Sequence, residues 1–211
     1  MAKRKSRGRH SDSKPLRRVI VIATEGKDTE RRYFDALNKK MPETNIKRVP
    51  RPSNRTQPIQ VLDDLICFKK NRGTKYAQGT PYWLIVDWDG RESSEIEAVA
   101  GKAKENGCRL ADSNPCFEVW LFQHYSSLRK IKGLAGDAVE GGCSRIIREL
   151  KKKKYDPNYD KSKYDVLKYL GCLDAAVINA SGDDFESDDE RMTLAHSRVY
   201  KLVESIINSS T

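Results

Sequence analysis

Hydrophobic and polar positions form two different patterns along the chain, and the first pattern predicts buried strands. Residues 18–24 (RVIVIAT) form a nearly continuous β-branched run, and residues 81–87 (PYWLIVD) form a second strong run. Continuous apolar runs of this length are typical of parallel strands that are covered on both faces. Weaker strands are expected over 45–50 and 108–111.

The second pattern has the periodicity of amphipathic helices and is found in the segments between the predicted strands. In the first of these segments, Tyr33 and Leu37 share an apolar face, and this helix is expected to end near Lys40. Further helices are expected over 59–69, 92–106 and 116–125. A strand–helix order repeated in this way predicts an α/β fold, with a largely parallel sheet flanked by helices on both faces.

The last third of the chain has a different pattern, without strong strand runs. Helices are expected there over 139–153, 162–180 and 190–208. We therefore expect three parts: a basic, disordered arm over residues 1–17, an α/β core over 18–127 and a helical C-terminal extension over 128–211.

Composition excludes several classes of protein. The chain has 211 residues, and its apolar runs are far too short to span a bilayer. No apolar stretch follows the basic N-terminus, so no signal peptide is expected. The five cysteines are scattered without a CxxC pair, so neither a disulfide framework nor a zinc cluster is expected. These features favour a soluble protein of the cytoplasm with no membrane partner.

The formal net charge of +10 is concentrated at the N-terminus. Residues 1–18 hold eight Lys or Arg and one acid, so the rest of the chain carries only +3. A basic arm of this kind attracts phosphate without regard to sequence, or serves as a solubilising tail. Both interpretations stay open.

Three acidic residues fall at the carboxyl ends of predicted strands, where open α/β sheets bind ligands. Glu25 ends the first strand, and Asp87 and Asp89 end the strand over 81–87. Residues two apart on an extended chain point to the same side, so the two aspartates can converge on one Mg²⁺. The alternative for the two aspartates is that they are ordinary residues of a surface loop. The alternatives for Glu25 and its neighbours are a favourable interaction with the helix dipole, or a phosphate-binding turn at the helix N-terminus. Neither the P-loop nor the GxGxxG pattern is present.

Glu118 lies within an apolar, aromatic stretch over 116–122, where a carboxylate is costly unless it is paired or bound to metal. It is therefore a candidate catalytic residue, and its alternative role is to cap its own helix or to pair with a lysine. His124 is a secondary candidate, since a lone histidine is more often a core or rim residue.

Several of these residues belong to motifs that resemble the RloB family. The motifs are Glu25-Gly-x-x-Thr29-Glu30-x-x-Tyr33-Phe34, Asp87-x-Asp89 and SNPCFEVW over 113–120, with further similarity at 159–162, 193–196 and 202–204. The 113–120 block is the most specific of them. The resemblance covers about residues 18–207.

The resemblance implies a Toprim-like (topoisomerase–primase) core related to the AbiL phage-exclusion component. In such a core Glu25 is the glutamate that binds metal or acts as general acid/base, and Asp87 and Asp89 bind Mg²⁺ or Mn²⁺. Lys161 matches a family position and is the candidate cation for the reacting phosphate; its alternative is a solvated lysine. The family is nuclease-like and associated with defence, often beside an AAA-type ATPase.

A basic segment offers a candidate nucleic-acid surface. Residues 129–170 hold twelve Lys or Arg against six acids. The candidate contacts are Lys27, Arg145, Arg148, Lys151, Lys152, Lys153 and Lys154. Tyr155, Tyr159, Tyr164 and Tyr169 interleave with these charges, as in proteins that stack bases of single strands. The alternative is an ordinary solvated face.

Taken together, we expect a Mg²⁺-dependent nuclease of antiviral defence that acts on RNA such as tRNA, or on DNA, under the control of an ATPase partner. A homo-oligomer is compatible with this expectation. The alternatives are a non-catalytic nucleic-acid-binding or regulatory module and, last, a phosphoryl or nucleotidyl transferase. Arg191 and His196 have the spacing of a metal-independent ribonuclease motif, but the strand content argues against that all-helical fold. His196 stays a secondary candidate.

Overall fold

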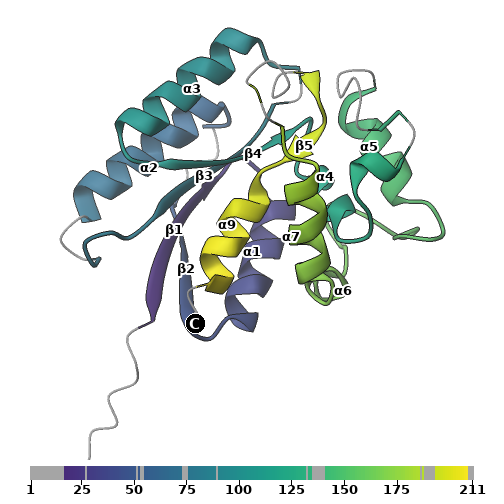
Figure 1. The fold of residues 1–211 in the computed structure, drawn as a ribbon. Helices are drawn as coiled ribbons and strands as arrows, with labels where there is room; N and C mark the ends of the chain where they lie inside the picture. Colours follow the sequence, from purple (N-terminus) through teal and green to yellow (C-terminus); the bar gives the residue numbers. More distant parts are fainter. Residues whose placement is uncertain are drawn as a thin grey trace, which may run out of the picture.

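A five-stranded sheet forms the centre of the protein in this computed structural model, with strand order β2-β1-β3-β4-β5 (Figure 1). The strands are β1 (Arg18–Thr24), β2 (Thr44–Arg48), β3 (Tyr82–Asp87), β4 (Arg109–Asn114) and β5 (His196–Ser197). The first four are parallel, and β5 pairs antiparallel with β4. The structure describes residues 17–26, 28–50, 52, 55–72, 76–88, 90–131, 133–134, 141–185, 187 and 193–208. The basic arm therefore lies almost entirely outside the described residues.

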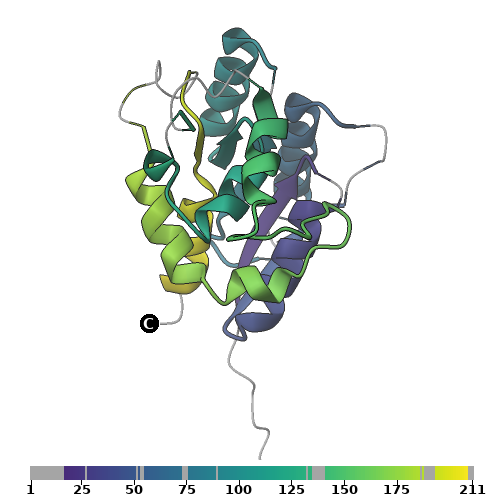
Figure 2. The ribbon, with the colours of Figure 1, turned by 90° about the vertical axis from the view of Figure 1, so that its right-hand side faces the viewer.

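Helices cover both faces of this sheet (Figures 1 and 2). One face is covered by α2 (Pro58–Arg72) and α3 (Ser93–Glu105). The other is covered by α1 (Thr29–Lys40), α4 (Glu118–Gln123), α7 (Leu173–Gly182) and α9 (Val199–Ile207). Beside α4 and α1 lie the short helices η1 (Leu128–Lys130), α5 (Gly142–Leu150) and α6 (Val166–Leu170). This arrangement confirms the predicted α/β fold.

The alternation of side chains along β1 explains why this strand reads as a continuous apolar run. Ile20 and Ile22 are buried in the cluster under α1, α4, α7 and α9. Val21 and Ala23 are buried in the second cluster, under α2 and α3. Because side chains of a strand alternate between faces, a strand covered on both sides needs apolar residues at consecutive positions.

The C-terminal part differs from the helices expected there. Residues 190–208 were expected to be helical, but among the described residues of this range His196 and Ser197 form the strand β5, and the helix α9 begins only at Val199. The helix expected over 162–180 is divided into α6 and α7. A two-residue strand leaves no hydrophobic pattern of its own, since it is created by pairing with Ser113 and Asn114 of β4.

The C-terminal elements also share their core with the sheet. Val199, Leu202, Val203 and Ile206 of α9 are fully buried in the same hydrophobic cluster as Ile20 and Ile22 of β1. The expected division near residue 127 therefore does not correspond to a gap between two hydrophobic cores. Among the described residues, no helix has the length and apolar character that a bilayer crossing requires.

Candidate active site

A small cavity opens at the carboxyl ends of the central strands. Its volume is about 220 Å³, and its wall is formed by Gly26, Asp28, Thr29, Glu30, Asp87, Phe117, Glu118 and Lys161. Ligands of open α/β sheets gather at this edge. The cavity thus lies where the sequence predicted the site, and it contains both expected and unexpected side chains.

Glu25 and Asp87 meet here because β1 and β3 are neighbours in the sheet. The backbone N–H of Glu25 donates to the carbonyl oxygen of Ile85 at 3.1 Å, which keeps Glu25 alongside the end of β3. The backbone N–H of Asp87 in turn lies 3.4 Å from Oε2 of Glu25. Glu25 and Asp87 therefore lie at neighbouring strand ends, as expected. The expected convergence of Asp87 with Asp89 stays a prediction, because Asp89 lies outside the described residues.

Glu30 is a further acid of the cavity that the sequence analysis did not assign to the site. It lies in the first turn of α1 and is almost completely buried. Its carboxylate lies so close to Gly26 that a β-carbon at residue 26 would overlap it. The glycine of the Glu25-Gly26 pair therefore makes room for a second glutamate.

Burial and neighbouring acids raise the pKa values of Asp87 and Glu30. Burial, followed by the charges of Glu30, Glu118 and Glu25, holds the pKa of Asp87 well above its usual range. Burial and the charges of Glu118 and Glu25 raise the pKa of Glu30 to about 7. Oδ1 of Asp87 is buried and has no hydrogen-bond partner among the described residues. A divalent cation would supply the positive charge that this group of oxygens lacks.

Arg91 provides a positive charge on one side of the cavity. It follows β3 in the sequence, and its guanidinium lies 2.6 Å from Oε1 of Glu25 and 2.7 Å from Oε1 of Glu95. Its Nε also donates to the carbonyl oxygen of Asp87 at 3.2 Å. Arg91 therefore fixes the orientation of Glu25. No motif or spacing in the sequence identified Arg91 as a residue of the site.

Glu118 and Lys161 form an ion pair in the wall of the cavity. Nζ of Lys161 lies 3.0 Å from Oε1 of Glu118, whose side chain is only 2% exposed. The hydroxyl of Tyr159 donates to the same oxygen at 2.8 Å. The position matched by family resemblance, Lys161, thus reaches the cavity from the second half of the chain, and Glu118 has the lysine partner considered as its alternative role.

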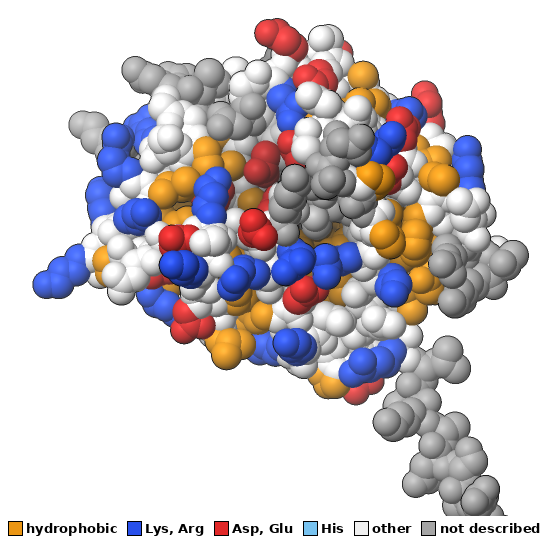
Figure 3. Space-filling model, turned by 180° about the vertical axis from the view of Figure 1, so that it is seen from behind, with side chains coloured by type: hydrophobic (Ala, Val, Ile, Leu, Met, Phe, Trp, Pro, Cys, Tyr) orange, Lys and Arg blue, Asp and Glu red, His pale blue; other side chains and the backbone are white. Residues whose placement is uncertain are grey.

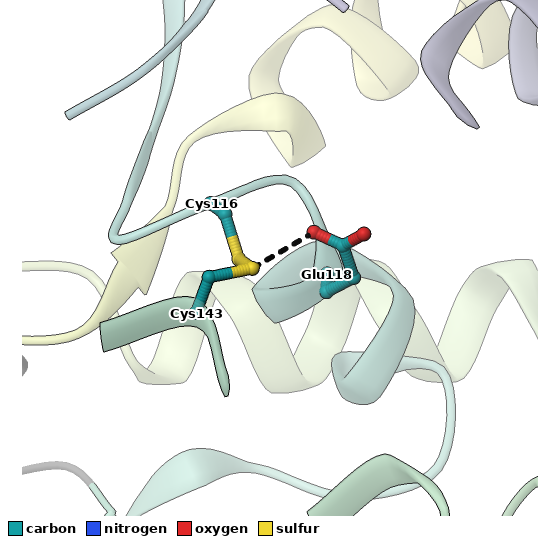
Figure 4. A group of neighbouring side chains, drawn as sticks. All are labelled: Cys116, Glu118 and Cys143. Carbon is teal, nitrogen blue, oxygen red and sulfur yellow. Dashed lines mark hydrogen bonds between the residues drawn. A yellow bond between two sulfur atoms is a disulfide. The ribbon is translucent and has the colours of Figure 1, made fainter. Parts of the chain in front are cut away.

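A disulfide between Cys116 and Cys143 borders this wall. Sγ of Cys143 lies 3.3 Å from Oε2 of Glu118 (Figure 4) and 3.8 Å from Nζ of Lys161. The sequence predicted no disulfide framework, and this single bridge was not anticipated. Neither cysteine has a nearby cysteine in the sequence, and only the packing of α5 beside α4 brings them together.

The two histidines named as secondary candidates do not line the cavity. His124 is packed among aromatic rings, its ring nitrogens lie 2.9 Å from the carbonyl oxygen of Trp120 and 3.1 Å from the hydroxyl of Tyr33, and burial lowers its pKa to about 4. His196 is buried in β5, 3.5 Å from Asp112. Both have the surroundings of core histidines.

The basic segment differs in part from its expected form. Arg145 and Arg148 lie on α5, but Lys151–Lys154 lie in turns after its end, where they are exposed. Three of the four interleaved tyrosines, Tyr159, Tyr164 and Tyr169, are buried. The expected stacking of bases on these three rings is therefore wrong, because the rings pack into the core. Lys27 lies outside the described residues.

Lysine and arginine side chains are not confined to this segment. Figure 3 shows a row of them across the middle of the face opposite to that of Figure 1, with acidic side chains beside them.

These features define an α/β protein with a carboxylate-lined cavity at the carboxyl edge of a mainly parallel sheet. The sequence pattern of the family described as "RloB-like protein" matches residues 20–206, and the chain therefore belongs to the RloB-like family. No curated protein and no solved structure matches the chain. The match confirms the resemblance on which Lys161 was selected.

Proposed function

We propose that this protein is a Toprim-type nuclease that depends on Mg²⁺ or Mn²⁺. The observation that carries the proposal is the close group of four acids, Glu25, Glu30, Asp87 and Glu118, of which Glu30 and Glu118 are buried. Burial, and then the charges of the neighbouring acids, raise the pKa values of Asp87 and Glu30. A scaffold has no need for such repulsion, since buried like charges destabilise a fold. A metal-dependent enzyme needs such a group of carboxylates to hold its cation.

Glu25, Glu30 and Asp87 are the residues that would hold the metal, together with Asp89 of the DxD motif. Carboxylate oxygens are the ligands that Mg²⁺ prefers, and the unpartnered Oδ1 of Asp87 fits such a ligand. When bound, the ion would neutralise phosphodiester oxygens and lower the pKa of bound water.

The remaining residues orient the substrate and move the proton. Lys161, held at the cavity wall by Glu118, supplies a positive charge for the phosphate of the substrate as negative charge develops on it. Glu25, oriented by Arg91, has one of two roles: it binds the metal, or it accepts the proton of the attacking water in place of binding the metal. Tyr159 keeps the Glu118 carboxylate in position for Lys161.

The substrate class and the biological setting rest on membership of the family. The resemblance supports a nucleic-acid substrate, tRNA or other RNA or DNA, and a role in prokaryotic antiviral defence with an AAA-type ATPase partner. The exposed lysines at 151–154 and the basic arm supply positive charge for phosphate binding.

The test is cleavage by the purified full chain. Total tRNA, single-stranded RNA, plasmid DNA and single-stranded DNA are incubated with Mg²⁺, Mn²⁺ or EDTA. Wild-type protein should cut one of these classes only with metal, and Glu25→Ala, Asp87→Asn and Glu30→Gln should abolish cutting. Glu97→Gln, an exposed acid on α3, is the matched control and should cut normally.

Cutting in EDTA, or normal cutting by Asp87→Asn, would contradict the proposal. If nothing is cut, Mn²⁺ binding measured by calorimetry separates the remaining cases. Binding that is lost in Asp87→Asn would favour a regulatory module that retains the site, and no binding at all would contradict the metal site itself.

A further inference from the structure

Three side chains with metal-binding atoms meet at the outer wall of the cavity. Cys116 lies between β4 and α4, Glu118 begins α4, and Cys143 lies in the first turn of α5. The two sulfur atoms and a carboxylate oxygen lie within 4.8 Å of one another (Figure 4). In the structure the two sulfurs are joined as a disulfide.

The carboxylate of Glu118 is oriented so that its two oxygens face different partners. Oε1 is bound by Tyr159 at 2.8 Å and by Lys161 at 3.0 Å. Oε2 lies 3.3 Å from Sγ of Cys143, which has no hydrogen to donate while it belongs to a disulfide. Partners that orient a carboxylate in this way are typical of the surroundings of metal ligands.

We propose that reduction of the Cys116–Cys143 disulfide creates a site for one Zn²⁺ ion, bound by both thiolates and by Oε2 of Glu118. Zinc prefers thiolate sulfur at about 2.3 Å and also accepts carboxylate oxygen, in a tetrahedral arrangement. Harder cations such as Mg²⁺ avoid sulfur, so the two cysteines select a thiophilic metal. Three protein ligands leave the fourth position open.

Formal charge favours the same assignment. Two thiolates and one carboxylate carry three negative charges, of which Zn²⁺ neutralises two. The ammonium group of Lys161, which lies 3.8 Å from Sγ of Cys143, balances the third. The reduced and loaded site is therefore neutral, which lowers the cost of its partial burial.

The conversion needs a dithiol as reductant. One of its thiolates attacks a sulfur of the disulfide, the S–S bond breaks, and a mixed disulfide forms. The second thiol of the reductant then releases the protein thiol and closes a disulfide within the reductant. Cys116 and Cys143 gain two electrons and two protons, and Zn²⁺ displaces the two protons when it binds.

This proposal does not depend on nuclease activity. The proposed Mg²⁺ ligands are Glu25, Glu30, Asp87 and Asp89, whereas the zinc ligands would be Cys116, Cys143 and Glu118. Zinc binding is therefore measured without nucleic acid, and its failure leaves the proposed function untouched.

The experiment compares oxidised and dithiol-reduced full chain under anaerobic conditions, after removal of the reductant. Zn²⁺ is titrated against a chromophoric chelator. The carboxylates of the proposed Mg²⁺ site also bind Zn²⁺, so reduced protein should bind one equivalent more than oxidised protein. Co²⁺ in place of Zn²⁺ should show a thiolate-to-metal charge-transfer band in the reduced protein alone. Cys143→Ser should weaken binding roughly 100-fold, and Glu118→Gln roughly 10-fold. Cys67→Ser and Cys172→Ser, which remove exposed free cysteines, are matched controls and should bind like wild type.

Three results would overturn the proposal. The first is reduced wild-type protein that binds no more zinc than oxidised protein, a comparison that needs no variant and so does not depend on whether a variant folds. The second is Cys143→Ser that binds as tightly as Cys67→Ser. The third is five titratable thiols in oxidised, denatured protein, where the disulfide leaves only Cys67, Cys108 and Cys172 free.

Discussion

The carboxylate of Glu30 occupies the space that a β-carbon of residue 26 would fill. The turn after β1 and the first turn of α1 are thereby packed against each other through a glycine. This contact holds a buried glutamate in the cavity that also contains Asp87. Gly26 therefore determines the geometry of the site although it has no side chain.

Replacing this glycine should displace the acid. In Gly26→Ala the new β-carbon collides with the Glu30 carboxylate, so Glu30 must leave its present position. We expect Mn²⁺ affinity, measured by calorimetry, to fall roughly 10-fold or more. Gly101→Ala is the matched control, because a β-carbon there meets no atom and alanine favours the helix by up to about 1 kcal/mol. Unchanged affinity in Gly26→Ala would show that Glu30 does not contribute to metal binding.

The stability of the metal-free protein should decrease as pH rises. The folded protein raises the pKa of Glu30 from 4.5 to about 7, so the folded state binds this proton more tightly than the unfolded state. The free energy of unfolding should therefore fall between pH 4.5 and 7, by at most about 3 kcal/mol, and then level off. Asp87, whose pKa is also raised, acts in the same direction.

Thermal unfolding in EDTA at pH 5 and pH 8 measures this effect. The melting temperature should be lower at pH 8, and Mg²⁺ should restore much of the difference because the ion binds the ionised carboxylates of the folded state. Glu30→Gln should flatten the pH dependence. An equally steep profile in this variant would assign the effect to other groups.

Tyr159 and Lys161 should act on stability through the same atom. Both bind Oε1 of Glu118, so the loss of either leaves the buried carboxylate with one partner fewer. Tyr159→Phe should cost about 1–2 kcal/mol in urea unfolding. In a double-mutant cycle with Lys161→Met, the two effects should not be additive, since removing both partners leaves Glu118 unpaired. Additive losses would mean that the two residues stabilise the fold independently.

The exposed lysines after α5 should matter for affinity rather than for cleavage chemistry. Lys151→Glu combined with Lys153→Glu should weaken binding of a single-stranded oligonucleotide and reduce the salt dependence by roughly one unit of slope for each lost phosphate contact. Fluorescence anisotropy over a salt series measures both quantities. Lys39→Glu combined with Lys47→Glu changes the same charge at exposed positions of α1 and β2 and is the control. Equal effects of both pairs would indicate a general charge effect.

The residues of the site that could be predicted from local sequence are those at the carboxyl ends of the predicted strands. A buried run such as β1 or β3 is visible in the pattern, and its next polar residue lies at the carboxyl edge, as Glu25 and Asp87 do. Lys161 was found only by family resemblance. No periodic pattern places a lysine from a turn before α6 beside Glu118 of α4.

The errors have one physical origin, which is that tertiary packing decides burial. Tyr159, Tyr164 and Tyr169 alternate with lysines. The same sequence pattern is compatible with exposed rings that stack on bases and with buried rings that pack against α1 and α4, as in this structure. Cys116 and Cys143 gave no spacing signal, because a disulfide requires only proximity in space. Arg91 and Glu30 lie near expected site residues, but their contacts arise from side-chain directions that the sequence does not specify.

The position of β5 affects the order in which the protein is completed during synthesis. Glu25, Glu30, Asp87 and Glu118 leave the ribosome well before Lys161, and β5 follows later still. Until Lys161 emerges, the carboxylate of Glu118 lacks its lysine partner, and until β5 emerges, β4 is an open edge strand. An unpaired buried charge disfavours the folded state, and an open edge strand invites pairing with other chains. A nascent chain that has passed Glu118 but not Lys161 therefore carries the acids of the site without the lysine that completes the wall of the cavity.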